Sequence, residues 1–182
     1  FYRSLIRANM EDVGGLRIDH VMAIRRLWWC FENNSQQDGC YVYYPFEQLL
    51  AILKIESHLN QCVVIGEDLG VVPNEVREAL KASAIYSNGL FYFEKDHQGE
   101  FLAAEHFAPH SLLMIANHDV PPFKGWWIGH DITIKQQYGL LDDEQTRAQF
   151  DARNIEKHRM LNFIARESNQ HLSLETDAFT VY

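Results

Sequence analysis

The sequence has few cysteines, no long hydrophobic run and fewer basic than acidic residues. Its three cysteines, Cys30, Cys40 and Cys62, include no Cys-x-x-Cys pair. This argues against a disulfide framework or a structural zinc site and predicts a reducing, cytoplasmic setting. No apolar stretch approaches the roughly 18 residues of a membrane span, so we expect no membrane partner. With 16 Lys and Arg against 25 Asp and Glu, the net charge of −9 argues against a basic groove, and we expect no nucleic-acid partner.

The length of 182 residues corresponds to one domain or part of one, at roughly 150 residues per domain. Hydrophobic residues make up 47% of the chain and charged residues 23%, as in ordinary globular proteins. We find no repeat, low-complexity tract or linker, and therefore place residues 1–182 in one domain without an internal boundary. Because the first residue is Phe1 rather than Met, we expect an internal fragment of a longer chain.

Apolar patterns predict strands that alternate with helices along most of the chain. The predicted strands cover residues 15–19, 61–67, 90–93 and 111–116, and the predicted helices cover residues 21–31, 46–59, 75–81 and 142–164. Continuous apolar strands separated by helices favour an α/β fold with a parallel sheet.

Three acidic residues, Asp19, Glu67 and Asp119, each lie at the carboxyl end of a separate predicted strand. Parallel α/β sheets bind ligands at that edge, and only a tertiary fold could gather residues so far apart in sequence. Two carboxylates across a glycosidic bond can act as proton donor and nucleophile, while a third raises the donor's pKa and holds ring hydroxyls. Arg17 shares a strand face with Asp19 and would keep that nucleophile ionised.

Other interpretations of these residues stay open at this point. An acid at a strand end is often a helix cap, a turn residue or a solvated surface group. His20 and His118, which adjoin two of the acids, can be ordinary hydrogen-bonded neighbours. The pairs Asp19/His20 and His118/Asp119 could also bind a metal, but no His-x-His or His-Glu-x-x-His spacing supports this, and we expect no metal.

Three short segments resemble signature segments of a known enzyme family. Gly15–His20 (GLRIDH), Ile65–Gly70 (IGEDLG) and Ala116–Asp119 (ANHD) are similar to those of 4-alpha-glucanotransferases, also called amylomaltases or disproportionating enzymes. These enzymes form glycoside hydrolase family 77 of the alpha-amylase clan. Tyr41–Pro45 and Gly125–Trp127 resemble the bacterial branch of the family.

The resemblance implies a (β/α)8 TIM barrel, of which this chain supplies approximately strands four to seven with their helices. The missing remainder of the barrel is then its structural partner, and the chain alone is expected to be inactive. By the same resemblance Asp19 is the catalytic nucleophile, Glu67 rather than Asp68 is the general acid/base, and Asp119 stabilises the transition state.

The resemblance also implies substrate contacts and a reaction. Arg17 and His118 match residues that support the nucleophile and hold sugar hydroxyls, and Asn117 stands where many family members have Thr. Trp126 and Tyr43 are candidate aromatic platforms for sugar, with ordinary core packing as the alternative. The expected reaction moves α-1,4-glucan segments between malto-oligosaccharides by a retaining double displacement, without a cofactor. The alternatives are an α-amylase-type retaining hydrolase and a noncatalytic glucan-binding module.

Overall fold

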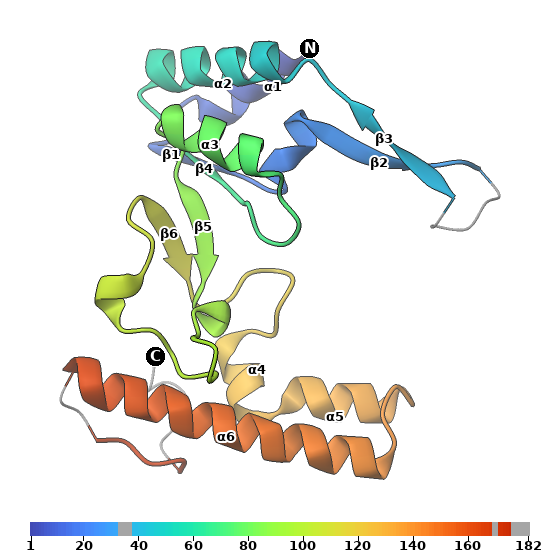
Figure 1. Ribbon diagram of the computed structural model, residues 1–182, viewed down its shortest axis with the longest axis vertical. Coiled ribbons are helices and arrows are strands. Elements are labelled where there is room, and N and C mark those ends of the chain that lie inside the picture. The colour runs from blue at the N-terminus through green and yellow to red at the C-terminus, as the bar shows by residue number, and fades with distance from the viewer. Residues whose placement is uncertain (33–37, 169–170, 176–182) are drawn as a thin grey trace. The chain divides into compact units, whose positions relative to one another are not determined.

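The computed structural model describes residues 1–32, 38–168 and 171–175 (Figure 1). In chain order the elements are α1 (Tyr2–Met10), β1 (Gly15–Ile18), the 3-10 helix η1 (Val21–Ile24), β2 (Arg26–Cys30), β3 (Gly39–Tyr43), α2 (Phe46–Asn60), β4 (Val63–Gly66), α3 (Asn74–Ala82), β5 (Ser87–Leu90), the 3-10 helices η2 (Phe91–Phe93) and η3 (Ala104–His106), β6 (Ser111–Met114), α4 (Phe123–Ile128), α5 (His130–Gln137) and α6 (Asp143–Ser168).

The chain divides into two compact units. The first unit comprises residues 1–89 and 110–112, and the second comprises residues 90–109 and the described residues from 113 onward. Each unit has its own cluster of buried apolar side chains. The mixed α/β architecture predicted from the sequence is confirmed, whereas the assignment of both units to a single domain stays a prediction.

Two short parallel strands lie at the centre of the first unit. β1 pairs with β4 in a register that places Ile18 opposite Gly66 at the carboxyl ends of both strands. Tyr86 forms a parallel bridge to Ile65, so the segment leading into β5 continues beside β4. β5 in turn pairs with β6. The predicted strands 15–19 and 61–67 therefore exist, and each ends just before its acidic residue.

Three helices contribute apolar side chains to the core of the first unit. In α2, Phe46, Leu50 and Leu53 recur at helical spacing and are all buried. α1 contributes Ile6 and Met10 to the same core. The predicted helices at residues 46–59 and 75–81 are confirmed as α2 and α3, and α6 contains nearly all of the helix predicted at residues 142–164.

The predicted helix at residues 21–31 is wrong, because its second half forms β2, the first strand of a hairpin. Only η1 is helical, and β2 pairs antiparallel with β3, which sets Trp28 opposite Tyr41. Aromatic side chains favour strands, and the partner strand lies too far along the chain for a local pattern to reveal it. The crowded apolar residues that resemble a helix are instead exposed along β2.

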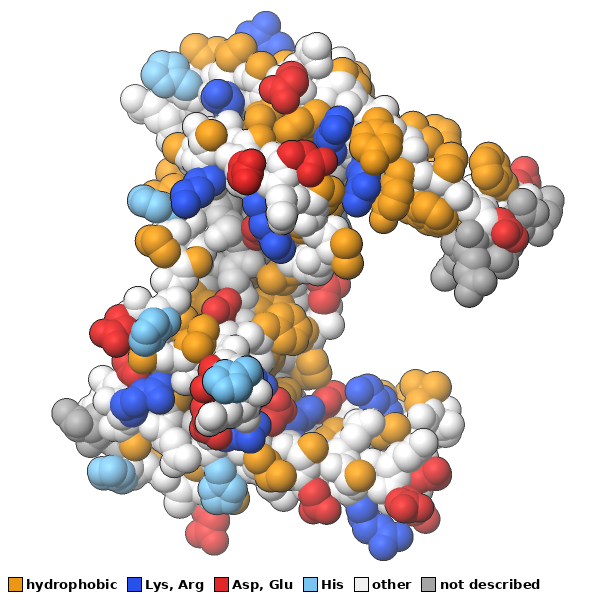
Figure 2. All heavy atoms as spheres, in the orientation of Figure 1, with side chains coloured by type: hydrophobic (Ala, Val, Ile, Leu, Met, Phe, Trp, Pro, Cys, Tyr) orange, Lys and Arg blue, Asp and Glu red, His pale blue; other side chains and the backbone are white. Residues whose placement is uncertain are grey.

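The hairpin β2–β3 carries exposed aromatic side chains, seen in Figure 2 as a group of apolar side chains. Trp28 and Tyr41 pack edge to face with ring centroids 5.0 Å apart, and the guanidinium of Arg26 lies 4.0 Å from the centroid of Tyr41. The indole Nε1 of Trp29 donates a hydrogen bond to the hydroxyl of Tyr44 at 3.0 Å. These contacts order the ribbon although a two-stranded hairpin is weak by itself.

Arg153 joins the three helices of the second unit. Its guanidinium donates to both carboxylate oxygens of Asp131, at 2.9 and 2.8 Å, and to the backbone carbonyl of Trp126 at 2.5 Å. Burial opposes ionisation of Asp131, yet the hydrogen bonds and charge of Arg153 outweigh it and keep the pKa of that carboxyl below its usual value. The ion pair therefore holds α6 against α4 and α5.

The predicted strand at residues 90–93 is wrong in position. β5 ends at Leu90, and the next three residues turn into η2, where Phe91 and Tyr92 are buried in the aromatic core of the second unit. Phe91 stacks on Phe101 with ring centroids 4.6 Å apart. The predicted strand at 111–116 exists in shorter form as β6. Within the described part of the chain, no helix combines the length and apolar character needed to cross a bilayer.

A buried carboxylate on α2 holds α1, a helix that the sequence pattern does not predict. Glu56 is 0% exposed. Its oxygens accept hydrogen bonds from Nε of Arg3 at 2.6 Å and from Nε and Nη2 of Arg7 at 2.9 and 3.1 Å. The hydrogen bonds from Arg7 and then Arg3 lower the pKa of Glu56 from 4.5 to about 2, against the opposing effect of burial.

We predict that Glu56→Gln lowers the melting temperature at pH 7 and weakens its dependence on acid. Because the folded pKa of about 2 lies below the ordinary 4.5, the ionised carboxylate stabilises the fold above pH 4.5 and loses this effect as the pH falls towards 2. Melting curves by circular dichroism between pH 7 and pH 2 test this, with exposed Glu47→Gln on the same helix as control. A Glu56→Gln profile parallel to that of the wild type would contradict the prediction.

Candidate active site

The register of β1 and β4 brings two of the three predicted acids together. Ile18 pairs with Gly66, so the next residues, Asp19 and Glu67, leave the two strands side by side. The backbone continues this pairing, because the N–H of Glu67 donates to the carbonyl of Ile18 at 2.8 Å. Gly66 is needed at this point, since a Cβ there would lie only 2.9 Å from Cγ1 of Val21.

Glu67 is almost fully buried, at 2% exposed, and both its oxygens are held by backbone groups. The N–H of His20 donates to Oε2 at 2.9 Å, and the N–H of Leu69 donates to Oε1 at 2.5 Å. The carbonyl of Glu67 also accepts the N–H of Val21 at 2.9 Å. These bonds fix the carboxylate to the loops after both strands.

Asp19 is more open, with 41% of its side chain exposed. Arg17 projects from the same strand and donates from Nη1 to Oδ1 of Asp19 at 2.9 Å, as the alternation of side chains predicts. The two acids thus differ in their surroundings: Asp19 contacts a cation and is reachable, whereas Glu67 is enclosed and contacts amide dipoles.

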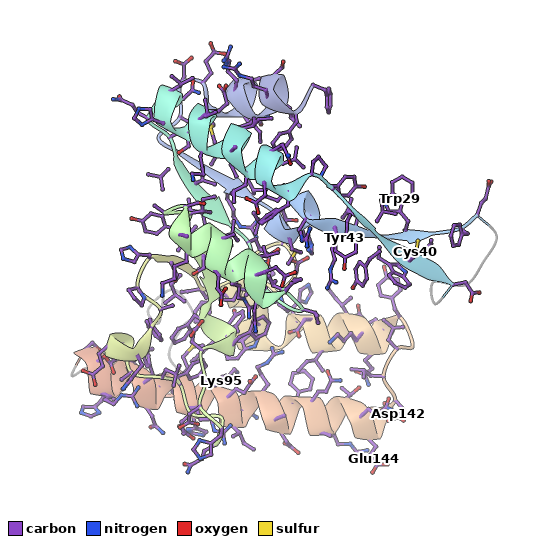
Figure 3. The ribbon with its side chains drawn as sticks, turned by 45° about the horizontal axis from the view of Figure 1, so that its top comes forward. Trp29, Cys40, Tyr43, Lys95, Asp142 and Glu144 are labelled. Carbon is purple, nitrogen blue, oxygen red and sulfur yellow. The ribbon has the colours of Figure 1, made fainter. Side chains whose placement is uncertain are left out.

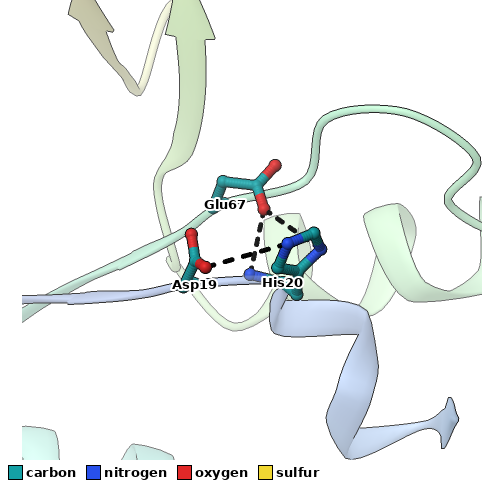
Figure 4. Close-up of side chains that lie close together, drawn as sticks. All are labelled: Asp19, His20 and Glu67. Carbon is teal, nitrogen blue, oxygen red and sulfur yellow. Dashed lines mark hydrogen bonds and ion pairs between the residues drawn. The ribbon is translucent and has the colours of Figure 1, made fainter. Parts of the chain in front are cut away.

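His20 lies beside both acids (Figure 4). Its Nε2 is 3.8 Å from Oδ2 of Asp19 and its Nδ1 is 3.7 Å from Oε2 of Glu67. His20 adopts a left-handed backbone conformation, with φ of 46°, and this turn starts η1 directly after the strand. One ligand atom from each of Asp19, His20 and Glu67 lies within 4.8 Å of the others. The two carboxylates are therefore close enough to act on one bond.

A metal ion is a possible occupant of such a group, and the described residues contain one group of this kind. It consists of Asp19, His20 and Glu67, whereas the sequence-based alternative also involved His118 and Asp119, which belong to the second unit. Each oxygen of Glu67 already accepts one N–H group. Two close carboxylates beside an imidazole can also serve proton transfer.

Asp68, the acid next to Glu67, is held in other contacts. Its Oδ1 accepts the backbone N–H of Asn88 at 3.3 Å, and its Oδ2 lies 3.7 Å from Nε of Arg77. Arg77 also donates to the carbonyl of Asp68 at 3.1 Å. These contacts tie the loop after β4 to α3 and β5, which supports the choice of Glu67 as the acid that faces Asp19.

Asn88 has a place in the site that sequence reasoning missed. Its side chain on β5 is buried and its Oδ1 accepts a hydrogen bond from Nε of Arg17 at 2.6 Å. No spacing or motif signals this contact, because Arg17 and Asn88 belong to strands that are distant in sequence. The only sequence signal is a polar residue within an otherwise strand-like segment.

Asp119 belongs to the second unit and lies in the loop after β6. Within its own loop, its backbone N–H donates to Oδ1 of Asn117 at 3.0 Å, and Nδ2 of Asn117 donates to Oδ2 of Asp119 at 3.2 Å. Nε2 of His118 lies 3.5 Å from Oδ1 of Asp119. The three predicted residues after β6 therefore contact one another.

The two candidate aromatic platforms lie in different surroundings. Tyr43 is 54% exposed on the hairpin, where Figure 3 shows it on β3 near Trp29 and Cys40. Trp126 is only 5% exposed and stacks on Tyr92 with ring centroids 5.1 Å apart, while the guanidinium of Arg153 lies 4.8 Å from its ring. In this structure Trp126 packs the core of the second unit.

Known proteins with related sequences share one enzymatic description. A 4-alpha-glucanotransferase from Haemophilus influenzae is 40% identical over 177 residues, which is 97% of this chain and 25% of that protein. A 4-alpha-glucanotransferase from Mycobacterium bovis is 33% identical over 144 residues, covering 77% of this chain and 20% of its own length. The chain thus spans about a quarter or less of these curated relatives.

Solved structures give the same relationship at the level of the fold. The crystal structure of amylomaltase from Corynebacterium glutamicum matches with a TM-score of 0.83 and 30% identity, over 91% of this chain and 23% of that one. An amylomaltase from Streptococcus agalactiae, solved in complex with acarbose, shares the fold with a TM-score of 0.62 and 19% identity, over 93% of this chain and 30% of its own.

The family model for 4-alpha-glucanotransferases matches residues 1–180, nearly the whole chain. This match includes both strand ends that carry Asp19 and Glu67 and the loop that carries Asp119. With its mixed α/β fold and its close pair of acids, the chain belongs to the 4-alpha-glucanotransferase family.

Proposed function

We propose that this chain is the part of a catalytic (β/α)8 barrel that contains strands four to seven, with β1, β4, β5 and β6 in that order. The enzyme would transfer α-1,4-glucan segments between malto-oligosaccharides by a retaining double displacement. The observation that carries this proposal is the pair of acids at neighbouring parallel strand ends, with an oxygen of Asp19 within 4.8 Å of an oxygen of Glu67. Retaining enzymes hold their two carboxyl groups about 5 to 5.5 Å apart, whereas inverting enzymes need about 6.5 to 9.5 Å.

Asp19 has the surroundings of a nucleophile. Arg17 donates a hydrogen bond to its carboxylate, and its exposed side chain is reachable by an anomeric carbon. In the first step an Asp19 oxygen bonds to that carbon as the glycosidic bond breaks, and the glycosyl segment then rests on Asp19 until an acceptor hydroxyl takes it.

Glu67 has the complementary role of proton donor and then proton acceptor. It protonates the departing sugar oxygen and afterwards removes the proton of the acceptor hydroxyl. Each Glu67 oxygen accepts one N–H bond, and each keeps a second lone pair that can take a proton.

The remaining groups are proposed to hold the substrate. Asp119 would stabilise the distorted sugar, and His118 and Asn117, which contact Asp119, would bind hydroxyl groups beside it. Tyr43 offers an exposed ring for stacking on a sugar face. The proposal includes the rest of the barrel as partner. It also includes a cytoplasmic setting, which is supported by the small number of cysteines and the lack of a Cys-x-x-Cys pair in the sequence.

Product analysis of the intact enzyme with maltotriose tests this function. We predict glucose together with maltodextrins longer than maltotriose, because an acceptor sugar takes the segment from Asp19. Thin-layer or anion-exchange chromatography resolves these products. An increase in reducing ends without longer chains would favour the hydrolase, and glucan binding without turnover would favour the noncatalytic module.

Asp19→Asn should abolish formation of a covalent glycosyl-enzyme and lower the transfer rate by about a thousandfold or more, since an amide is a poor nucleophile. A slowly reacting fluorinated glycosyl donor followed by peptide mass spectrometry identifies the labelled residue in the wild type. Asp12→Asn, at an exposed acid in the turn after α1, serves as control and should label normally. A labelled peptide that lacks Asp19 would refute the assignment.

Glu67→Gln should lower the rate with maltotriose by roughly 100- to 10,000-fold, the usual contribution of general acid–base catalysis. The loss in the first step should be much smaller with α-glucosyl fluoride, because fluoride needs little protonation to leave. Steady-state and burst kinetics with both donors measure the difference, and Asp68→Asn is the matched control. Equal losses with both donors would exclude Glu67 as the acid.

A further inference from the structure

Asn88 is a buried amide with every hydrogen-bonding atom of its side chain in use. It is 1% exposed, and it lies on β5, the strand that follows β4 in the first unit. Its Nδ2 donates to the backbone carbonyl of Leu112 at 3.0 Å and to that of Gly89 at 3.1 Å. Its Oδ1 accepts Nε of Arg17 at 2.6 Å. The residue thus connects β5, β6 and β1.

The contacts of the amide determine which end faces Arg17. Carbonyl oxygens accept the Nδ2 hydrogens on one side, and a guanidinium, which only donates, requires an oxygen on the other. A reversed amide would bring two donors together and two acceptors together. The backbone N–H of Asn88 is bonded to Oδ1 of Asp68 at 3.3 Å, which fixes the residue further.

Arg17 connects Asn88 to Asp19. The guanidinium is planar, so a partner at Nε and a second partner at Nη1 together set the orientation of the whole group. Nε contacts Asn88, and Nη1 donates to Oδ1 of Asp19 at 2.9 Å. Asp19 itself is 41% exposed, and therefore depends on such contacts for a defined position.

We propose that Asn88 is a positioning residue for the reaction: it orients Arg17, and through Arg17 it holds Asp19 in the geometry needed for attack. This inference rests on the proposed role of Asp19 as nucleophile. Asn88 is buried and bonds to Arg17, so it would act on Asp19 through that guanidinium. Because a displacement of about 1 Å in a reacting group can cost on the order of 100-fold in rate, loss of the amide should lower kcat more than it raises KM.

A double-mutant cycle in the intact enzyme tests the connection through Arg17. Asn88→Ala should lower kcat for maltotriose by about 10- to 100-fold with KM within about threefold of the wild type. In an Arg17→Lys background, where the Nε contact is already lost, the same change should lower kcat by less than about twofold. Asn88→Ser provides a second, smaller perturbation with the same readout if the alanine variant does not fold. Melting curves confirm that each variant is folded at the assay temperature.

Glu56→Gln is the matched control, because Glu56 is buried in the same unit but contacts Arg3 and Arg7 instead of Arg17. Its effect on kcat should be equally small with and without Arg17→Lys, whatever its effect on stability. If the fold-decrease in kcat of the double variant equals the product of the two single-variant decreases, the inference is overturned. That result would show that Asn88 acts independently of Arg17. Absence of transfer by the wild-type enzyme would overturn the proposed function and this inference together, whereas an active wild type with multiplying losses would overturn this inference alone.

Discussion

The parallel pairing of β1 with β4 is the constraint on which the candidate site depends. Its register ends with Ile18 opposite Gly66, so the next residue of each strand is an acid and the two acids emerge at the same level. A shift of one residue would turn every side chain of one strand to the opposite face and separate the pair. The short strands are sufficient because backbone hydrogen bonds continue the alignment through Glu67 and Val21.

The first unit contains two buried glutamates whose partners differ in kind. Glu56 is neutralised by the guanidinium groups of Arg3 and Arg7, which keep it ionised and fix one helix against another. Glu67 is held by the N–H groups of His20 and Leu69, which carry no net charge. The cations tie Glu56 to a neighbouring helix, whereas the backbone donors tie Glu67 to the two loops that carry the candidate site. The same residue type therefore joins two helices at Glu56 and lies at the candidate site at Glu67.

Much of the site could be predicted from the sequence, because Asp19 and Glu67 directly follow short apolar runs that form strands in the structure. The hairpin could not be predicted, because the apolar residues of 21–31 crowd together as in a helix. Its partner strand β3 is separated from them by a polar stretch of sequence. The strand predicted at residues 90–93 is misplaced for a related reason. Phe91 and Tyr92 are apolar because η2 is buried, and not because they form a strand.

Asn88 shows a second limit of prediction from sequence, since its contacts come from β1, β6 and the loop after β4. Each of these segments is ordinary by itself. Only the folded arrangement reveals that one amide satisfies donors and acceptors from all of them. Tertiary hydrogen bonding of this kind has no periodicity, and therefore leaves no pattern in the chain.

The register of the β2–β3 hairpin has a consequence for its two thiols. Trp29 lies opposite Cys40, and Cys30 lies opposite Gly39. Because consecutive side chains on a strand point to opposite faces, Cys30 and Cys40 project from different sides of the ribbon. A disulfide between Cys30 and Cys40 would therefore require one strand to shift by a residue, so the observed register disfavours this bond.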